Sequence, residues 1–177
     1  MRRTISGLDH SLSTWLQERP KSLRYFYGWI TLIGHPAIVI FIAGLGITFG
    51  FGRQLPAVGY AFILALATYG ASTALKLVLR RPRPSTPYAA GMFHTSFSFP
   101  SGHAFGSLIV YGLLAYFAYH YLSEPWSLLT SWGLWSLIFL IGVSRVYLGA
   151  HYVLDVLGGW LLSIPVLLWI TSFVIGQ

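Results

Sequence analysis

A histidine and an aspartate lie four residues apart near the start of the last apolar stretch, at His151 and Asp155. On a helix, this spacing places both side chains on one face, so that the carboxylate can hold one imidazole nitrogen. The other nitrogen is then directed as a nucleophile or a base. A second histidine, His103, begins another apolar stretch. One imidazole could therefore attack phosphorus while the other protonates the leaving oxygen.

Three basic residues lie at the ends of the same stretches and indicate a site for a phosphate-like oxyanion. Lys76 and Arg83 flank the end of the second stretch, and Arg145 closes the fourth. The segment 100–103, Pro-Ser-Gly-His, adds a hydroxyl and free backbone N–H groups at the N-terminus of a predicted helix, where anions are favoured. Ionisable side chains at membrane depth are costly and usually functional, so we expect these groups to form one pocket.

The composition identifies a membrane protein. The 177 residues are 55% hydrophobic and only 8% charged, with a mean hydropathy of +0.67, whereas a soluble domain is about 25% charged. The net charge of +7 favours an anionic surface or substrate. Nucleic acid is a poor candidate partner, because most of the chain would be buried in lipid.

The scarcity of metal-binding and thiol groups narrows the chemistry. The chain has no cysteine, which excludes disulfides, thiolate metal sites and cysteine nucleophiles. Its carboxylates are Asp9, Glu18, Glu124 and Asp155, too few and too scattered for a two-metal site built on bridging carboxylates.

Five apolar stretches are long enough to cross a hydrocarbon core of ~30 Å as helices of roughly 20 residues. They are continuously apolar, and lipid requires backbone groups to be paired within the segment, so the predicted fold is an all-α integral membrane bundle. In an up-and-down bundle, the ends of spans two and four meet the starts of spans three and five at one side. The predicted spans are 28–51, 55–79, 103–122, 126–146 and 152–176.

Two segments outside the spans have distinct patterns. In residues 1–27, apolar residues recur at helical spacing with Asp9, Ser13 and Gln17 between them, which predicts an amphipathic helix on the membrane surface. Residues 28–177 then form the membrane-embedded domain. The segment 80–102 contains four prolines, and we predict a loop without helix there. His94 in this loop is expected to be solvated.

The remaining polar residues have simpler interpretations. Arg80 and Arg81 fit a topology signal or contacts with lipid headgroups as well as they fit the pocket. His35 and His120 are predicted to be ordinary polar contacts within the bundle.

Taken together, three motifs resemble the signature of the type 2 phosphatidic acid phosphatase and vanadium haloperoxidase superfamily, in its membrane lipid phosphatase branch. The motifs are Lys76-x6-Arg83-Pro84, Pro100-Ser101-Gly102-His103 and Ser144-Arg145-x5-His151-x3-Asp155. The resemblance extends over residues 27–174. It implies hydrolysis of a phosphomonoester or diphosphate through a phosphohistidine, with no metal or other cofactor.

The resemblance also implies a role for each matching residue. His151 would be the nucleophile, Asp155 would orient it, and His103 would be the general acid that later activates water. Stabilising the charge on the phosphoryl oxygens is the dominant task in this chemistry. The residues implied to bind those oxygens are Lys76, Arg83, Ser101, Gly102 and Arg145.

Several alternatives stay open at this level. The substrate could be phosphatidylglycerophosphate, phosphatidate or a polyprenyl diphosphate such as undecaprenyl diphosphate. A non-catalytic carrier of anionic lipid would need the cations but no His151/Asp155 pair, and a vanadate-dependent peroxidase would be expected to be soluble.

The charge distribution and the resemblance disagree about sidedness in the cell membrane. Apart from the three predicted ligands, seven basic residues lie on the pocket side and only Arg53 on the other, which places the pocket in the cytoplasm by the positive-inside rule. Members of the resembling family with six spans generally open their sites to the outer face.

Overall fold

The computed structural model describes residues 2–92 and 97–175, and over these residues the chain is helical, with no strand. Four helices are long and apolar enough to span a membrane, or five spans if the bent pair α2 and α3 counts as one. This confirms the predicted all-α membrane bundle. In order, the elements are α1 Arg2–Gln17, the 3-10 turn Lys21–Leu23, α2 Arg24–Ile33, α3 Pro36–Gly52, α4 Pro56–Leu79, α5 Pro87–Ala90, α6 Gly102–Tyr121, α7 Trp126–Tyr147 and α8 Val153–Ile175.

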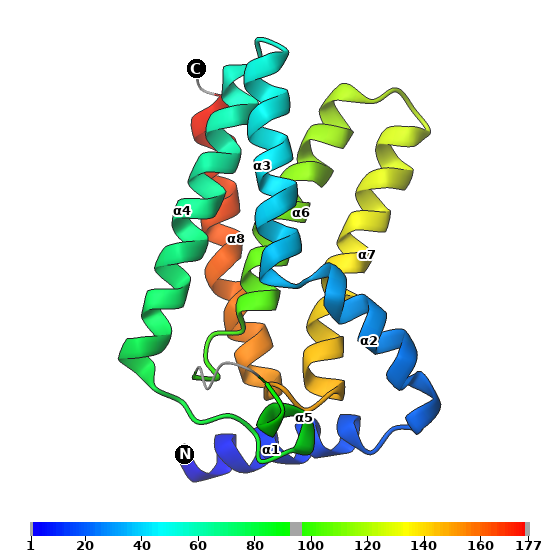
Figure 1. The fold of residues 1–177 in the computed structure, drawn as a ribbon, viewed down its shortest axis with the longest axis vertical. Helices are drawn as coiled ribbons and strands as arrows, with labels where there is room; N and C mark the ends of the chain where they lie inside the picture. Colours follow the sequence, from blue (N-terminus) through cyan, green and yellow to red (C-terminus); the bar gives the residue numbers. More distant parts are fainter. Residues whose placement is uncertain (1, 93–96, 176–177) are drawn as a thin grey trace.

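Helix α6 forms the centre of the bundle and packs against α3, α4, α7 and α8 (Figure 1). Its residues from Ala104 to Leu113 are all buried, whereas the other long helices expose large apolar side chains outward. A helix that is apolar all round is buried, and one that exposes apolar side chains needs lipid around it. The bundle therefore uses lipid as the solvent for its outer helices.

The first predicted span, 28–51, is broken. Helix α2 ends at Ile33, α3 begins at Pro36, and the two axes differ by 41°. Proline has no N–H and disfavours helical conformation in the residue before it, and His35 accordingly has an extended ψ of 139°. The predicted span is therefore made of two helices, and apolar composition does not report a break of two residues.

The segment between α4 and α6 also differs from its prediction. One turn of helix, α5, lies within the proline-rich stretch, because Pro87 occupies a first-turn position where no N–H is needed and the Thr86 hydroxyl caps Ala89 N. The expectation for His94 lies outside the described residues.

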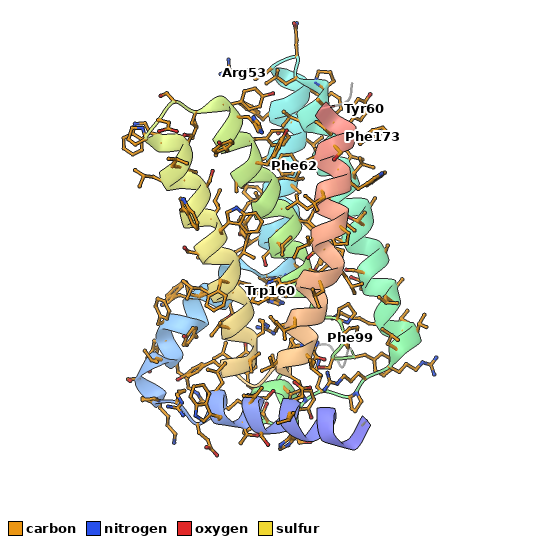
Figure 2. All side chains as sticks on the ribbon, turned by 180° about the vertical axis from the view of Figure 1, so that it is seen from behind. Arg53, Tyr60, Phe62, Phe99, Trp160 and Phe173 are labelled. Atoms are coloured by element: carbon orange, nitrogen blue, oxygen red, sulfur yellow. The ribbon has the colours of Figure 1, made fainter. Side chains whose placement is uncertain are left out.

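Helix α1 crosses the end of the bundle where α4 and α7 finish and where α6 and α8 begin (Figure 1). Its polar side is docked rather than solvated, since Asp9 and Ser13 are buried, whereas Leu8, Leu12 and Trp15 are exposed. Arg53 lies at the opposite end of the molecule, far from α1 (Figure 2). The position of α1 on a membrane surface stays a prediction.

Candidate active site

The His151 and Asp155 side chains lie together at the start of α8, both almost completely buried. The Nδ1 atom of His151 is 3.5 Å from Asp155 Oδ2. The turn that leads to His151 needs Gly149, whose φ of +80° a side chain would strain, and the Thr86 hydroxyl donates to the Gly149 carbonyl at 2.8 Å. A tight turn and a helix start thus place the imidazole beside the carboxylate.

The other imidazole nitrogen, His151 Nε2, lies 3.3 Å from Arg83 Nη1. A guanidinium can only donate, so Nε2 carries the lone pair and Nδ1 carries the proton toward Asp155. Burial, together with the charges of Arg145 and Arg83, lowers the pKa of His151 to about 3, although its hydrogen bond to Asp155 acts in the opposite direction. The imidazole is therefore neutral near pH 7, with its lone pair on Nε2.

Asp155 has other partners besides His151. Its Oδ2 accepts a hydrogen bond from the Ser98 hydroxyl and another from the Tyr152 N–H at 2.8 Å, while Oδ1 accepts from Arg81 Nη1 at 2.7 Å. Sequence reasoning missed Ser98 and treated Arg81 as a topology or headgroup residue. Neither contact has a periodic signal, because both depend on how the 80–102 segment folds back onto α8.

A close approach of two backbones holds that segment in place. Ser101 N–H donates to the Asp155 carbonyl at 2.9 Å. A Cβ on Gly159 would lie 2.9 Å from the Ser101 carbonyl oxygen, so a side chain there would displace the backbone. The small residue in α8 therefore allows α6 to begin directly against the helix that carries Asp155.

A cavity of about 870 Å³ opens beside His151. Six of the eight predicted site residues line it, and they come from five different segments of the chain. They are Lys76, Arg83, Gly102, His103, Arg145 and His151. Asp155 lies behind His151 and outside the lining.

The cations of the cavity are held close to one another. Arg145 is only 2% exposed, and its Nη1 donates to Thr31 Oγ1 at 2.5 Å, while its Nε has no partner among the described residues. Burial and the charge of Arg145 lower the pKa of Arg83, whose Nη1 also donates to the Ala150 carbonyl at 2.9 Å. A buried donor without a partner next to like charges is the arrangement that an anion relieves.

Ser101 and Gly102 have different positions. The Ser101 side chain is fully buried and accepts from Ala104 N at 3.5 Å as the N-cap of α6, outside the cavity lining. Gly102 lines the cavity, and a Cβ there would be 3.6 Å from the Lys76 ammonium. The structure therefore favours Gly102 over the Ser101 hydroxyl as a direct ligand, and both roles stay predictions.

Three further residues of the cavity were not predicted as site residues. Thr31 and Tyr88 contact the Arg145 guanidinium, and Tyr88 comes from the short helix α5. His35 caps α3 through Nδ1 at 3.2 Å from Ala37 N and lies with its ring 6.0 Å from that of His103. It was expected to be an ordinary polar contact, and it lines the cavity because the helix breaks beside it.

Comparison with known proteins identifies the family of this chain. The family model of the PAP2 superfamily matches residues 56–176. Phosphatidylglycerophosphatase B of Bacillus subtilis strain 168 is 32% identical over 152 residues, which cover 81% of this chain and 73% of that protein. The chain belongs to the PAP2 superfamily.

Solved structures agree with this assignment. The crystal structure of a transmembrane PAP2-type phosphatidylglycerolphosphate phosphatase from Bacillus subtilis matches with a TM-score of 0.76 and 30% identity, over 96% of this chain and 86% of that one. Aquifex aeolicus LpxE shares the fold, with a TM-score of 0.72 and 22% identity over 93% and 95% of the two chains. This protein is thus a multi-pass membrane lipid phosphatase, a hydrolase of lipid phosphates.

The contact of Ser98 with Asp155 gives a prediction. Replacing Ser98 by Ala removes one hydrogen bond from a buried carboxylate and loosens the hold on the imidazole. We expect kcat to fall about tenfold, equivalent to about 1.4 kcal/mol of barrier, with KM nearly unchanged. Steady-state kinetics on a lipid phosphate in detergent measure both constants.

The matched control is Ser163→Ala. Ser163 is also fully buried, but its hydroxyl donates only to carbonyls of its own helix, those of Gly159 and Trp160. This variant should keep kcat within about twofold of wild type. Equal kinetics for the two variants would show that Ser98 does not position Asp155.

Proposed function

We propose that this protein hydrolyses the phosphomonoester of phosphatidylglycerophosphate through a phosphohistidine on His151, without a metal. The observation that carries the proposal is the neutral imidazole with its Nε2 lone pair beside Arg83, next to a cavity lined by three cations. The Bacillus subtilis protein and the Bacillus subtilis crystal structure that this chain matches are both named for phosphatidylglycerophosphate, which supports this substrate over phosphatidate and undecaprenyl diphosphate.

In the first step, His151 Nε2 attacks phosphorus and the bond from phosphorus to the ester oxygen breaks. The leaving oxygen takes a proton from His103. As Nε2 forms its bond, the imidazole becomes cationic, and the Asp155 carboxylate 3.5 Å from Nδ1 stabilises that charge. Lys76, Arg83 and Arg145, with the Gly102 N–H at the start of α6, offset the charge on the phosphoryl oxygens.

In the second step, His103 takes a proton from water as the water oxygen attacks phosphorus. The bond from phosphorus to nitrogen breaks, phosphate leaves and His151 returns to its neutral form. Both histidines line the same cavity, which supports this division of roles.

Substitution of the two histidines tests the mechanism. His151→Ala removes the nucleophile and His103→Ala removes the proton donor, so each should lower kcat on phosphatidylglycerophosphate by at least about 10³-fold. Asp155→Asn should be milder, because it keeps a hydrogen-bond partner but loses the charge that favours the imidazolium. Phosphate release by purified protein, compared with release from phosphatidate and undecaprenyl diphosphate, measures these effects.

His120→Ala is the control for the histidine variants. His120 lies at the far end of α6 against Tyr116 and Tyr119, away from the cavity. The His120→Ala variant should have the kcat of the wild type. Full activity of His151→Ala would contradict the phosphohistidine mechanism. Faster phosphate release by wild type from undecaprenyl diphosphate than from phosphatidylglycerophosphate would show that the diphosphate is the better substrate.

The response to chelators and to vanadate tests metal independence. No three His, Asp or Glu side chains cluster as metal ligands in the parts of the chain that the structure describes. We expect full activity in EDTA and inhibition by vanadate, since a cationic pocket with a histidine nucleophile favours a trigonal-bipyramidal phosphate mimic over the ground state. Phosphate release with each additive is the measurement. Loss in EDTA that a divalent ion restores would overturn the metal-free mechanism.

We also propose that the site faces the cytoplasm. The basic residues of α1 and of the following turn lie at the cavity end, and Arg53 lies at the other (Figures 1 and 2). Arg81 forms ion pairs with Asp9 and Asp155, which removes it from the topology signal. Six basic residues remain at the cavity end against Arg53 at the other: Arg2, Arg3, Arg19, Lys21, Arg24 and Arg80. An excess of this size supports the cytoplasmic side.

Single cysteines test this sidedness, because the chain has none of its own. Ser85→Cys at the cavity end and Ser123→Cys at the other end are matched changes at exposed positions. With an impermeant thiol reagent on intact cells, we expect labelling at position 123 alone. Labelling at position 85 alone would place the site outside and make an outer-leaflet lipid the substrate.

A further inference from the structure

Helix α1 supplies the first hydrogen-bond acceptors of α8, the helix that carries Asp155. The Leu154 N–H donates to Asp9 Oδ1 at 2.9 Å, and the Val153 N–H donates to Ser13 Oγ at 3.0 Å. The first N–H groups of a helix have no partner within the helix, and a side chain usually satisfies them locally. Here that function comes from a helix about 140 residues earlier in the chain.

Asp9 also joins the ion pair of the active site. Arg81 donates through Nη2 to Asp9 Oδ2 at 2.5 Å and through Nη1 to Asp155 Oδ1 at 2.7 Å. The two carboxylates are 1% and 0% exposed, and the guanidinium lies 4.6 Å from the ring centre of Tyr152. A continuous chain of polar contacts therefore runs from α1 through Arg81 and Asp155 to His151.

The charges of Asp9, Arg81 and Asp155 affect how well Asp155 can stabilise a charged His151. If Arg81 were paired with Asp155 alone, the cation would cancel the carboxylate that must stabilise the imidazolium. With Asp9 on its other side, the three groups sum to one negative charge. The two carboxylates are buried and the Arg81 side chain is 28% exposed, so these charges interact more strongly than surface charges and are only partly screened.

We propose that Asp9 is a positioning residue for lipid phosphate hydrolysis: by balancing the charge of Arg81, it lets that arginine hold Asp155 without neutralising it. This inference rests on the proposed function of His151 and Asp155. One residue of the N-terminal helix thereby supports the catalytic residues, although it lies outside the three motifs.

A merely structural role for Asp9 would act through the cap on Leu154. Asp9→Asn separates the two roles, because the amide oxygen can still accept the Leu154 N–H while the charge is lost. Ser13→Ala is the matched control, since it removes a cap from the neighbouring N–H with no change of charge. Arg81→Gln removes the cation and keeps one donor for Asp155.

The experiment is a double-mutant cycle on the purified full chain, with kcat and KM on phosphatidylglycerophosphate in detergent. Asp9→Asn should lower kcat about tenfold, with KM within about twofold. This size is typical of a residue that positions a catalytic group without contacting the substrate. Ser13→Ala should keep kcat within about twofold. In the Arg81→Gln background, Asp9→Asn should change kcat by less than about twofold, because no cation remains to balance.

Three outcomes would overturn the inference. These are an unchanged kcat in Asp9→Asn, an equal loss in Ser13→Ala, and an undiminished effect of Asp9→Asn when Arg81 is Gln. If Asp9→Asn alone does not purify folded, the double variant still tests the inference, because a kcat more than about twofold below that of Arg81→Gln would overturn it. Failure of the proposed function is a separate result. It would show as an inactive wild type or an active His151→Ala variant, and neither measurement involves a change at Asp9.

Discussion

The buried carboxylate of Asp155 is the group on which the rest of the site depends. An ionised carboxylate without partners would be too costly at this depth, so the fold must surround it with donors. The described donors come from three segments: the Tyr152 N–H from its own turn, Ser98 from the segment before α6, and Arg81 from just after the end of α4. Each donor fixes one part of the chain against α8, so the carboxylate beside His151 also organises the end of the bundle.

The cation cluster presents the opposite problem. Lys76 and Arg145 are buried, and they share one cavity with Arg83. Like charges in a low-dielectric site repel one another. Burial is usually accompanied by pairing, yet the Nε of Arg145 has no partner among the residues described. Such a site stores unfavourable energy until an anion enters, and more charge on the anion gives more relief. Stabilisation that grows with developing charge is what accelerates phosphoryl transfer.

The sequence was sufficient for the features that composition and short spacing encode. Continuous apolar runs predicted α4, α6, α7 and α8 to within a residue or so, and the i to i+4 spacing predicted that His151 meets Asp155. The break at His35 was missed because a single proline in an apolar run reads as a tolerated residue. Ser98 and Asp9 were missed because their partners are distant in sequence, and no periodicity reports which polar residue of an amphipathic helix will be buried.

The two sides of α1 explain why such a helix lies at the catalytic end. Its buried polar side needs the N–H groups and the guanidinium that α8 and Arg81 offer there, while Leu8, Leu12 and Trp15 remain exposed. If α1 lies at the membrane surface, as its sequence predicts, its exposed apolar side chains can enter the lipid at headgroup depth while its polar groups still find partners. A phosphate on a lipid headgroup reaches the protein at that same depth. A lipid phosphatase that works on a headgroup would therefore need the cations, the proposed nucleophile and the N-terminal helix at one end of the bundle, which is where the structure has them.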